Sequence, residues 1–148
     1  MANSVLLDKF AKLAVEIGAN VQKDQIVVIN ASTETTDLAR RITKAAYEVG
    51  AKKVIVQWSD DFVSKYGYDY QSVDTLKDVP NYRIEKAHYL VDNGACVISI
   101  TSPIPGLNKD VDPNKMQEAG KAFSQASRSH DGEQITMEYS CSSKPNLG

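Results

Sequence analysis

Apolar residues near the start of the chain recur at the spacing of a helix. Four of them lie at i, i+4, i+7 and i+11: Leu6, Phe10, Leu13 and Ile17. This spacing predicts an amphipathic helix, for which Ser4 is a suitable N-cap and Gly18 a suitable residue just past the end.

Three short apolar runs, at residues 26–29, 54–56 and 95–100, are typical of parallel strands that helices cover on both faces. Helical stripes fall between and after them, at 38–49 before Gly50, at 84–91 between Pro80 and Gly94, and at 116–123 after Asp112-Pro113. Residues 58–79 show no sustained period and predict a short helix followed by a loop.

The resulting order, α-β-α-β-α-β-α, predicts an α/β fold with three layers, α-β-α, around a small and mostly parallel sheet. A fourth strand should follow the helix that ends near Ala126. The residues after Ala126 offer no continuous apolar run, so this strand is missing or degenerate.

Composition is that of one soluble globular domain, with 148 residues, 42% apolar residues, 24% charged residues and a net charge of −2. No basic excess favours nucleic acid, and no apolar run is long enough to span a membrane. The N-terminus does not resemble a signal peptide, and two cysteines are too few for a disulfide framework. A cytoplasmic protein is therefore expected. The apolar residues thin out after Ala126, where only Ile135, Met137, Tyr139, Cys141 and Leu147 remain.

Ligands of open parallel sheets bind beyond the carboxyl ends of the strands. The loop residues expected there are Asn30, Ser32 and Thr33, then Trp58, Ser59, Asp60 and Asp61, then Thr101 and Ser102. The first loop contains no glycine, which disfavours a dinucleotide site, and a hydroxyl of Thr33, Thr35 or Thr36 is more simply a helix cap.

Asp60-Asp61 and Trp58 are the candidate ligand or entrance residues. Adjacent carboxylates can bind a divalent cation or share a proton, but they also suit an N-cap followed by a first-turn acid. Trp58 can lie over a substrate or pack the end of the sheet.

The two histidines, His88 and His130, do not lie at metal-ligand spacing with other ligands. His88 is interpreted as a packed core residue. Three tyrosines, Tyr66, Tyr68 and Tyr70, suit an oligomer contact or local packing equally.

Several ordered motifs together resemble a known family. They are Leu-Ala-Val-Glu-Ile-Gly at 13–18, Ala-Ala-Tyr-Glu-Val-Gly-Ala-Lys-Lys-Val at 45–54, Trp-Ser-Asp-Asp at 58–61 and Val-Asp-Pro at 111–113. From about Leu6 to Ala126 the chain resembles the N-terminal domain of the thermophilic-type metalloaminopeptidases, the group of aminopeptidases T, S and II.

The resemblance implies a homodimeric enzyme that removes N-terminal residues from peptides with two divalent metal ions, Zn, Co or Mn. Glu, His and Asp ligands of the C-terminal domain hold these ions in the family. The chain does not contain that domain, so no catalytic or metal residue carries over to it, and we expect an N-terminal fragment that is inactive by itself. The alternative is a non-catalytic α/β module that binds a small ligand.

The tail at 127–148 departs from the family, but the genetic code allows a shift of one base to recover the likeness. Met137 is ATG and Glu138 begins with G, so the shifted frame reads TGG, a tryptophan. Permissible codons then continue as Ser-Ile-Val-Ala-Ala, a strand typical of the family, and residues 131–135 permit Met-Ala-Asn-Lys-Leu before it. The predicted organisation is an α/β domain at 1–126 followed by an out-of-frame tail.

Overall fold

A computed structural model describes residues 2–100 and 106–126, which fall into two compact units. The first unit contains residues 2–59 and 93–100, and the second contains residues 60–92 and 106–126. Thr101, Ser102 and the tail with the predicted fourth strand lie outside the described residues. No helix in the described part of the chain has the length and apolar character needed to cross a membrane.

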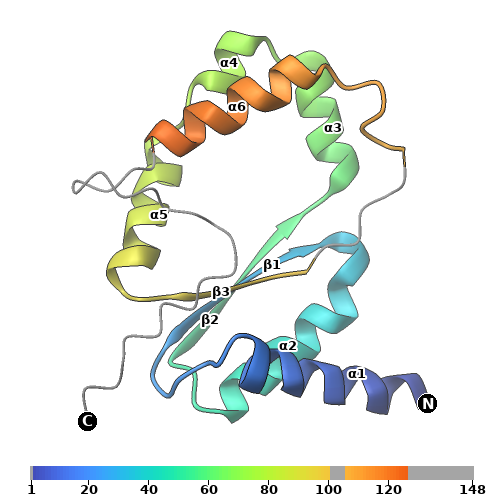
Figure 1. Cartoon of the computed structure of the whole chain (residues 1–148), viewed down its shortest axis with the longest axis vertical. Helices are drawn as coiled ribbons and strands as arrows, with labels where there is room; N and C mark the ends of the chain where they lie inside the picture. Colours follow the sequence, from blue (N-terminus) through green and yellow to red (C-terminus); the bar gives the residue numbers. More distant parts are fainter. Residues whose placement is uncertain (1, 101–105, 127–148) are drawn as a thin grey trace. The chain divides into compact units, whose positions relative to one another are not determined.

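The first unit is built on a parallel sheet of three strands (Figure 1), namely β1 (Ile26–Ser32), β2 (Lys53–Ser59) and β3 (Cys96–Ser99). The strand order is β2-β1-β3, and the register pairs Val28 with Ile55 on one side and with Val97 on the other. Val27, Val28 and Ile29 are completely buried because β1 is the central strand. The prediction of an α/β fold with a small parallel sheet is confirmed.

Two helices pack with this sheet, α1 (Ala2–Leu13), which runs into a π-helical turn at Ala14–Gly18, and α2 (Thr36–Glu48). Ala39, Ile42 and Ala46 of α2 share one buried cluster with Ile29 of β1. Helix α2 ends before Gly50, as predicted, and the φ of +99° at Gly50 explains why a glycine stands there.

Helix α1 forms where its periodicity predicts, but Ser4 is not its cap, because the helix already begins at Ala2. The buried side consists of Ala11 of α1 and Val15 of the π-helical turn that continues it, which are at most 1% exposed. Its large apolar side chains point away from the core, with 64% of Leu6, 56% of Phe10, 54% of Leu13 and 73% of Ile17 exposed. We call these four residues the α1 stripe.

The second unit is helical, with α3 (Asp61–Tyr70), α4 (Val73–Lys77), α5 (Asn81–Asp92) and α6 (Pro113–Ala126). The prediction of a loop after a short helix in 58–79 is wrong, because Ser72 caps a second helix there by accepting a hydrogen bond from the Thr75 amide at 3.1 Å. Lys115 of α6 donates to the carbonyl oxygens of Tyr68 and Gln71 at the end of α3, at 3.0 and 2.9 Å.

Helices α5 and α6 begin where their prolines predict. Helix α5 begins directly after Pro80, and α6 begins at Pro113. The carboxylate of Asp112 accepts a hydrogen bond from the Asn114 amide at 2.9 Å, so Asp112 is the N-cap of α6, directly before Pro113. The stripe predicted at 84–91 ends in Val91, which we expected to face inward, but on α5 the buried residues are Ala87 and Leu90 and Val91 is half exposed, so this part of the prediction is wrong.

Candidate functional site

A row of polar side chains crosses the sheet near the carboxyl ends of its strands. Asn30 of β1 pairs in register with Gln57 of β2 and with Ser99 of β3. The residue before each of them, Ile29, Val56 or Ile98, belongs to the buried cluster with α2 or packs on it. Because side chains alternate along a strand, the polar row lies on the opposite face of the sheet.

Within this row the hydrogen bonds are incomplete. The Asn30 amide Nδ2 donates to Ser99 Oγ at 3.4 Å. Gln57 Nε2 is buried and has no hydrogen-bond partner in the described part of the chain. A buried N–H without a partner costs about 1–3 kcal/mol, so an acceptor that reached Gln57 would be stabilised there.

Sequence reasoning named Asn30 but missed Gln57 and Ser99. It placed the carboxyl ends of the strands too early, since β1 continues to Ser32 and β2 to Ser59. The signal was present as one polar residue directly after the first two apolar runs, in Ile29-Asn30 and Val56-Gln57, and as the one polar residue within the third run, Ser99.

The turn after β1 satisfies its hydroxyl groups internally. Thr35 Oγ1 accepts a hydrogen bond from the Ser32 amide at 3.1 Å and donates to the Ser32 carbonyl at 3.0 Å. Thr36 Oγ1 donates to the Thr33 carbonyl at 2.8 Å. The hydroxyls therefore order the start of α2, as the capping interpretation predicts.

Asp60 and Asp61 open α3. The Asp60 carboxylate accepts a hydrogen bond from the Val63 amide at 3.1 Å, so it is the N-cap, and Asp61 is the acidic residue of the first turn. The N-terminal dipole of the helix favours both negative charges. Both aspartates therefore stabilise the start of α3. That they also bind a ligand stays a prediction.

Trp58 lies inside β2, and not in a loop after the strand as predicted. Alternation places its side chain on the same face as Val54 and Val56, opposite Ala31 in register. About half of it, 49%, is exposed, so packing of the sheet end covers only part of the indole. An exposed aromatic surface remains for a ligand or a partner.

Of the remaining candidates, His88 and the tyrosines belong to the second unit. His88 on α5 is half-buried and so less enclosed than a core histidine, and Tyr66 and Tyr70 on α3 are 55% and 86% exposed. His130 lies outside the described residues. Among residues 2–100 and 106–126, no three side chains of His, Cys, Asp and Glu are grouped as a metal ion would require.

Comparison with known proteins identifies the family. Residues 3–142 match the thermophilic metalloprotease (M29) family, and the chain belongs to this family. It is 42% identical over 120 residues to aminopeptidase AmpS of Bacillus subtilis and 38% identical over 120 residues to aminopeptidase 2 of Geobacillus stearothermophilus. In each comparison the match covers 81% of this chain and 29% of the relative.

A solved structure supports the same assignment. The chain resembles wild-type AmpT from Thermus thermophilus with a TM-score of 0.70 and 26% identity, over 82% of this chain and 30% of that one. The chain therefore spans less than a third of the length of these relatives.

The family name implies that a metal ion is bound. The side chains of the described residues do not form a site that could hold such an ion. Two divalent ions need several carboxylate or imidazole ligands converging on them, and no such group exists in residues 2–100 and 106–126. No step of metal chemistry is therefore assigned to these residues.

Proposed function

We propose that this chain is the N-terminal α/β domain of a cytoplasmic aminopeptidase that uses two divalent metal ions, and that it hydrolyses no peptide by itself. The observation that carries the proposal is the match to 29% of the length of AmpS, combined with the lack of a ligand group in the described residues. The metal ions, Zn, Co or Mn, would be held by the part of the enzyme that these residues do not span.

In the intact enzyme this domain would shape the entrance to the metal site and restrict access to the ends of peptides. Trp58, Asp60 and Asp61 are the proposed entrance residues. A half-exposed indole offers an apolar surface to a peptide side chain, and a carboxylate attracts the cationic α-amino group that marks an N-terminus. The further partner would be a second copy of the enzyme in a homodimer, with no nucleic acid and no membrane.

An assay of the purified 148-residue chain tests this function. The chain is incubated with aminoacyl-nitroanilide substrates and with Zn²⁺, Co²⁺ or Mn²⁺, beside full-length AmpS of Bacillus subtilis as the positive control. We expect no turnover by the chain with any of the metals. Sustained metal-dependent release of nitroaniline would overturn the proposal.

A second candidate function is a non-catalytic module that binds a small polar ligand at the strand ends. Gln57 favours it, because its buried Nε2 has no partner in the described part of the chain and would donate to a ligand oxygen. A ligand that binds only the folded protein raises its melting temperature. A panel of small carboxylates, sugars and nucleotides that leaves the melting temperature unchanged would remove this candidate.

A further inference from the structure

The α1 stripe is an apolar surface on a helix whose other side is packed against the rest of the first unit. Ala11 and Val15 bury the inner side of the helix, and Arg41 of α2 hydrogen-bonds Asp8 and the Ser4 carbonyl. These contacts fix the rotation of α1 about its axis. The outward direction of Leu6, Phe10, Leu13 and Ile17 therefore follows from the packing of the other side.

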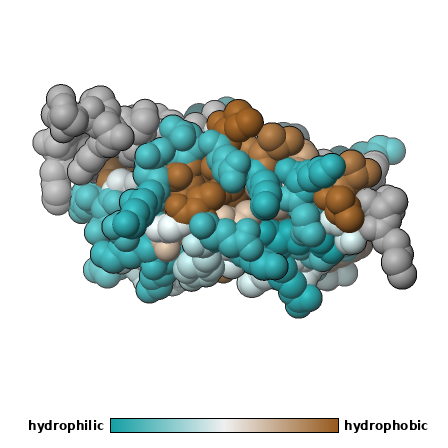
Figure 2. All heavy atoms as spheres, turned by 90° about the horizontal axis from the view of Figure 1, so that it is seen from below, coloured by the Kyte–Doolittle hydropathy of each residue, from teal (hydrophilic) through white to brown (hydrophobic). Residues whose placement is uncertain are grey.

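The stripe is continuous. Its residues follow one another at helical spacing, and Leu6, Leu7, Lys9, Phe10 and Leu13 line a pocket of ≈ 650 Å³. Figure 2 views the molecule from below and shows hydrophobic side chains gathered between hydrophilic ones on this face. Scattered single apolar residues are ordinary on a surface, but a contiguous patch with a polar rim marks an interaction site.

The size of the stripe decides between possible occupants. Four half-exposed side chains on one helix offer on the order of 500 Å², the size of a large surface patch on a monomer. A stable complex between separate proteins buries about 800 Å² on each partner. The stripe is too small to hold a second copy by itself, but it suffices for a segment of the same polypeptide, whose effective concentration is about millimolar.

We propose that the α1 stripe is the surface on which the rest of an M29 aminopeptidase packs, namely the part that the relatives have beyond the 29% matched here. This inference rests on the proposed function, since it takes the chain to be one domain of such an enzyme. The occupant is a folded part of the same polypeptide, and it presents apolar side chains to Phe10 and Leu13.

Cysteine reactivity tests this proposal in two proteins. In the 148-residue chain, Phe10→Cys and Leu13→Cys are labelled with a thiol reagent, with Lys12→Cys on the same helix as the control and mass spectrometry to locate the label. In full-length AmpS of Bacillus subtilis, cysteines are placed at the residues that align with Phe10, Leu13 and Lys12. Aminopeptidase activity shows that each AmpS variant is folded.

We expect the three cysteines of the 148-residue chain to react at similar rates. In AmpS, the cysteines aligned with Phe10 and Leu13 should react at least tenfold more slowly than the one aligned with Lys12. Equal rates in active AmpS would overturn the proposal. It would also be overturned if the Phe10→Cys chain became protected with rising concentration as it dimerised, because a second copy would then cover the stripe.

The reactivity does not depend on turnover by the 148-residue chain. Metal-dependent activity of that chain would contradict the proposed function without changing the labelling rates. Unprotected cysteines in active AmpS would contradict the docking surface and leave the proposed function standing.

Discussion

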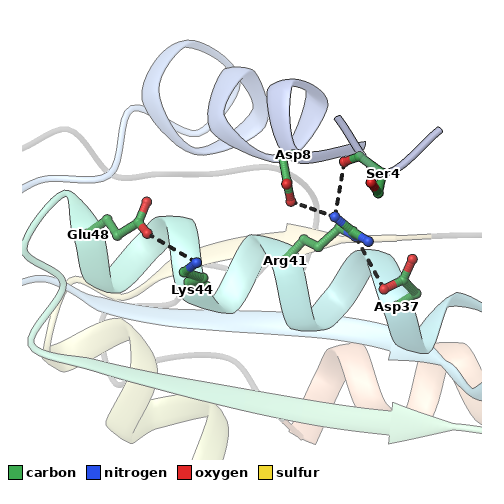
Figure 3. A network of polar contacts seen from close by, with 6 residues as sticks. All are labelled: Ser4, Asp8, Asp37, Arg41, Lys44 and Glu48. Atoms are coloured by element: carbon green, nitrogen blue, oxygen red, sulfur yellow. Dashed lines mark hydrogen bonds and ion pairs between the residues drawn. The ribbon is translucent and has the colours of Figure 1, made fainter. Parts of the chain in front are cut away.

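Arg41 Nη1 of α2 lies 2.6 Å from Asp8 Oδ1 of α1, and this ion pair joins the two helices of the first unit (Figure 3). The same nitrogen donates to the Ser4 carbonyl at 3.0 Å, and Arg41 Nε donates to Asp37 Oδ1 at 3.2 Å. The hydrogen bond to Asp8 is the main cause that raises the pKa of Arg41 above its ordinary value. One guanidinium therefore holds the first turns of α1 against α2.

Replacing Arg41 by Gln should lower the melting temperature by a few degrees, because three contacts between or within the helices are lost. Lys44→Gln is the control, since the Lys44–Glu48 pair is long at 3.8 Å and well exposed, and such pairs contribute little. Because the pKa of Arg41 is raised, its contribution to stability is fully present below the ordinary pKa of arginine and is lost only as the pH rises through the raised pKa. The difference between wild type and Arg41→Gln should thus stay constant from about pH 7 to pH 10. Equal effects of the two variants would contradict this role of Arg41.

Helix α1 offers a direct test of which side is buried. Val15→Ala should lower the free energy of unfolding by about 2 kcal/mol, because it removes two buried methyl groups and leaves a cavity. Phe10→Ala, although it removes a larger side chain, should change it by less than about 0.5 kcal/mol, since the ring is mostly in solvent. Urea denaturation measures both. A larger loss for Phe10→Ala would show that the stripe is covered in the isolated chain.

The helix itself could be predicted from the sequence, whereas its orientation could not. The spacing of Leu6, Phe10, Leu13 and Ile17 is that of an amphipathic helix, and such a stripe ordinarily faces the core. The small residues Ala11 and Val15 face the core instead, because they allow a close approach to α2 and because the large residues sit on another side of the helix. Hydrophobicity alone does not separate a core face from a docking face.

The candidate site could be predicted only in part, because the sequence does not show where the strands end or how they pair. Apolar runs mark the buried middle of a strand, so they place β1 correctly but end it at Ile29, before Asn30 and Ser32. That Gln57 and Ser99 lie beside Asn30 depends on the register of three strands, which is a tertiary property. The motifs that resemble the metalloaminopeptidases identified the family without that information.

Two substitutions of Asp60 test whether this residue stabilises the protein by capping α3 or by its negative charge. Asp60→Ala should lower the free energy of unfolding by about 1 kcal/mol, because the Val63 amide loses its acceptor. Asp60→Asn keeps an oxygen acceptor and should stay close to wild type. Chemical denaturation of the two variants makes the comparison. A loss for Asp60→Asn as large as that for Asp60→Ala would show that the negative charge, and not the cap, is what this position supplies.

The tail carries a prediction about the gene. The family match extends to residue 142, but the pairwise matches to AmpS and aminopeptidase 2 cover only 120 residues. If residues from about 127 onward are read out of frame, the coding DNA shifted by one base should encode Met-Ala-Asn-Lys, then Trp-Ser-Ile-Val-Ala-Ala, and then continue in the likeness of the M29 family. Sequencing about fifty bases around codon 127 gives the answer. An early stop codon in the other frame, or a continuation unlike the family, would end this hypothesis.

The central proposal is that these 148 residues correspond to the N-terminal part of an M29 metalloaminopeptidase and do not themselves hold its metal ions. Equilibrium dialysis of the 148-residue chain against Zn²⁺, followed by elemental analysis, tests it most directly, with full-length AmpS dialysed alongside as the control. The account predicts that the chain retains no stoichiometric zinc while AmpS retains about two ions per subunit, as a two-metal site requires. Retention of about two tightly held ions by the chain itself would contradict the account.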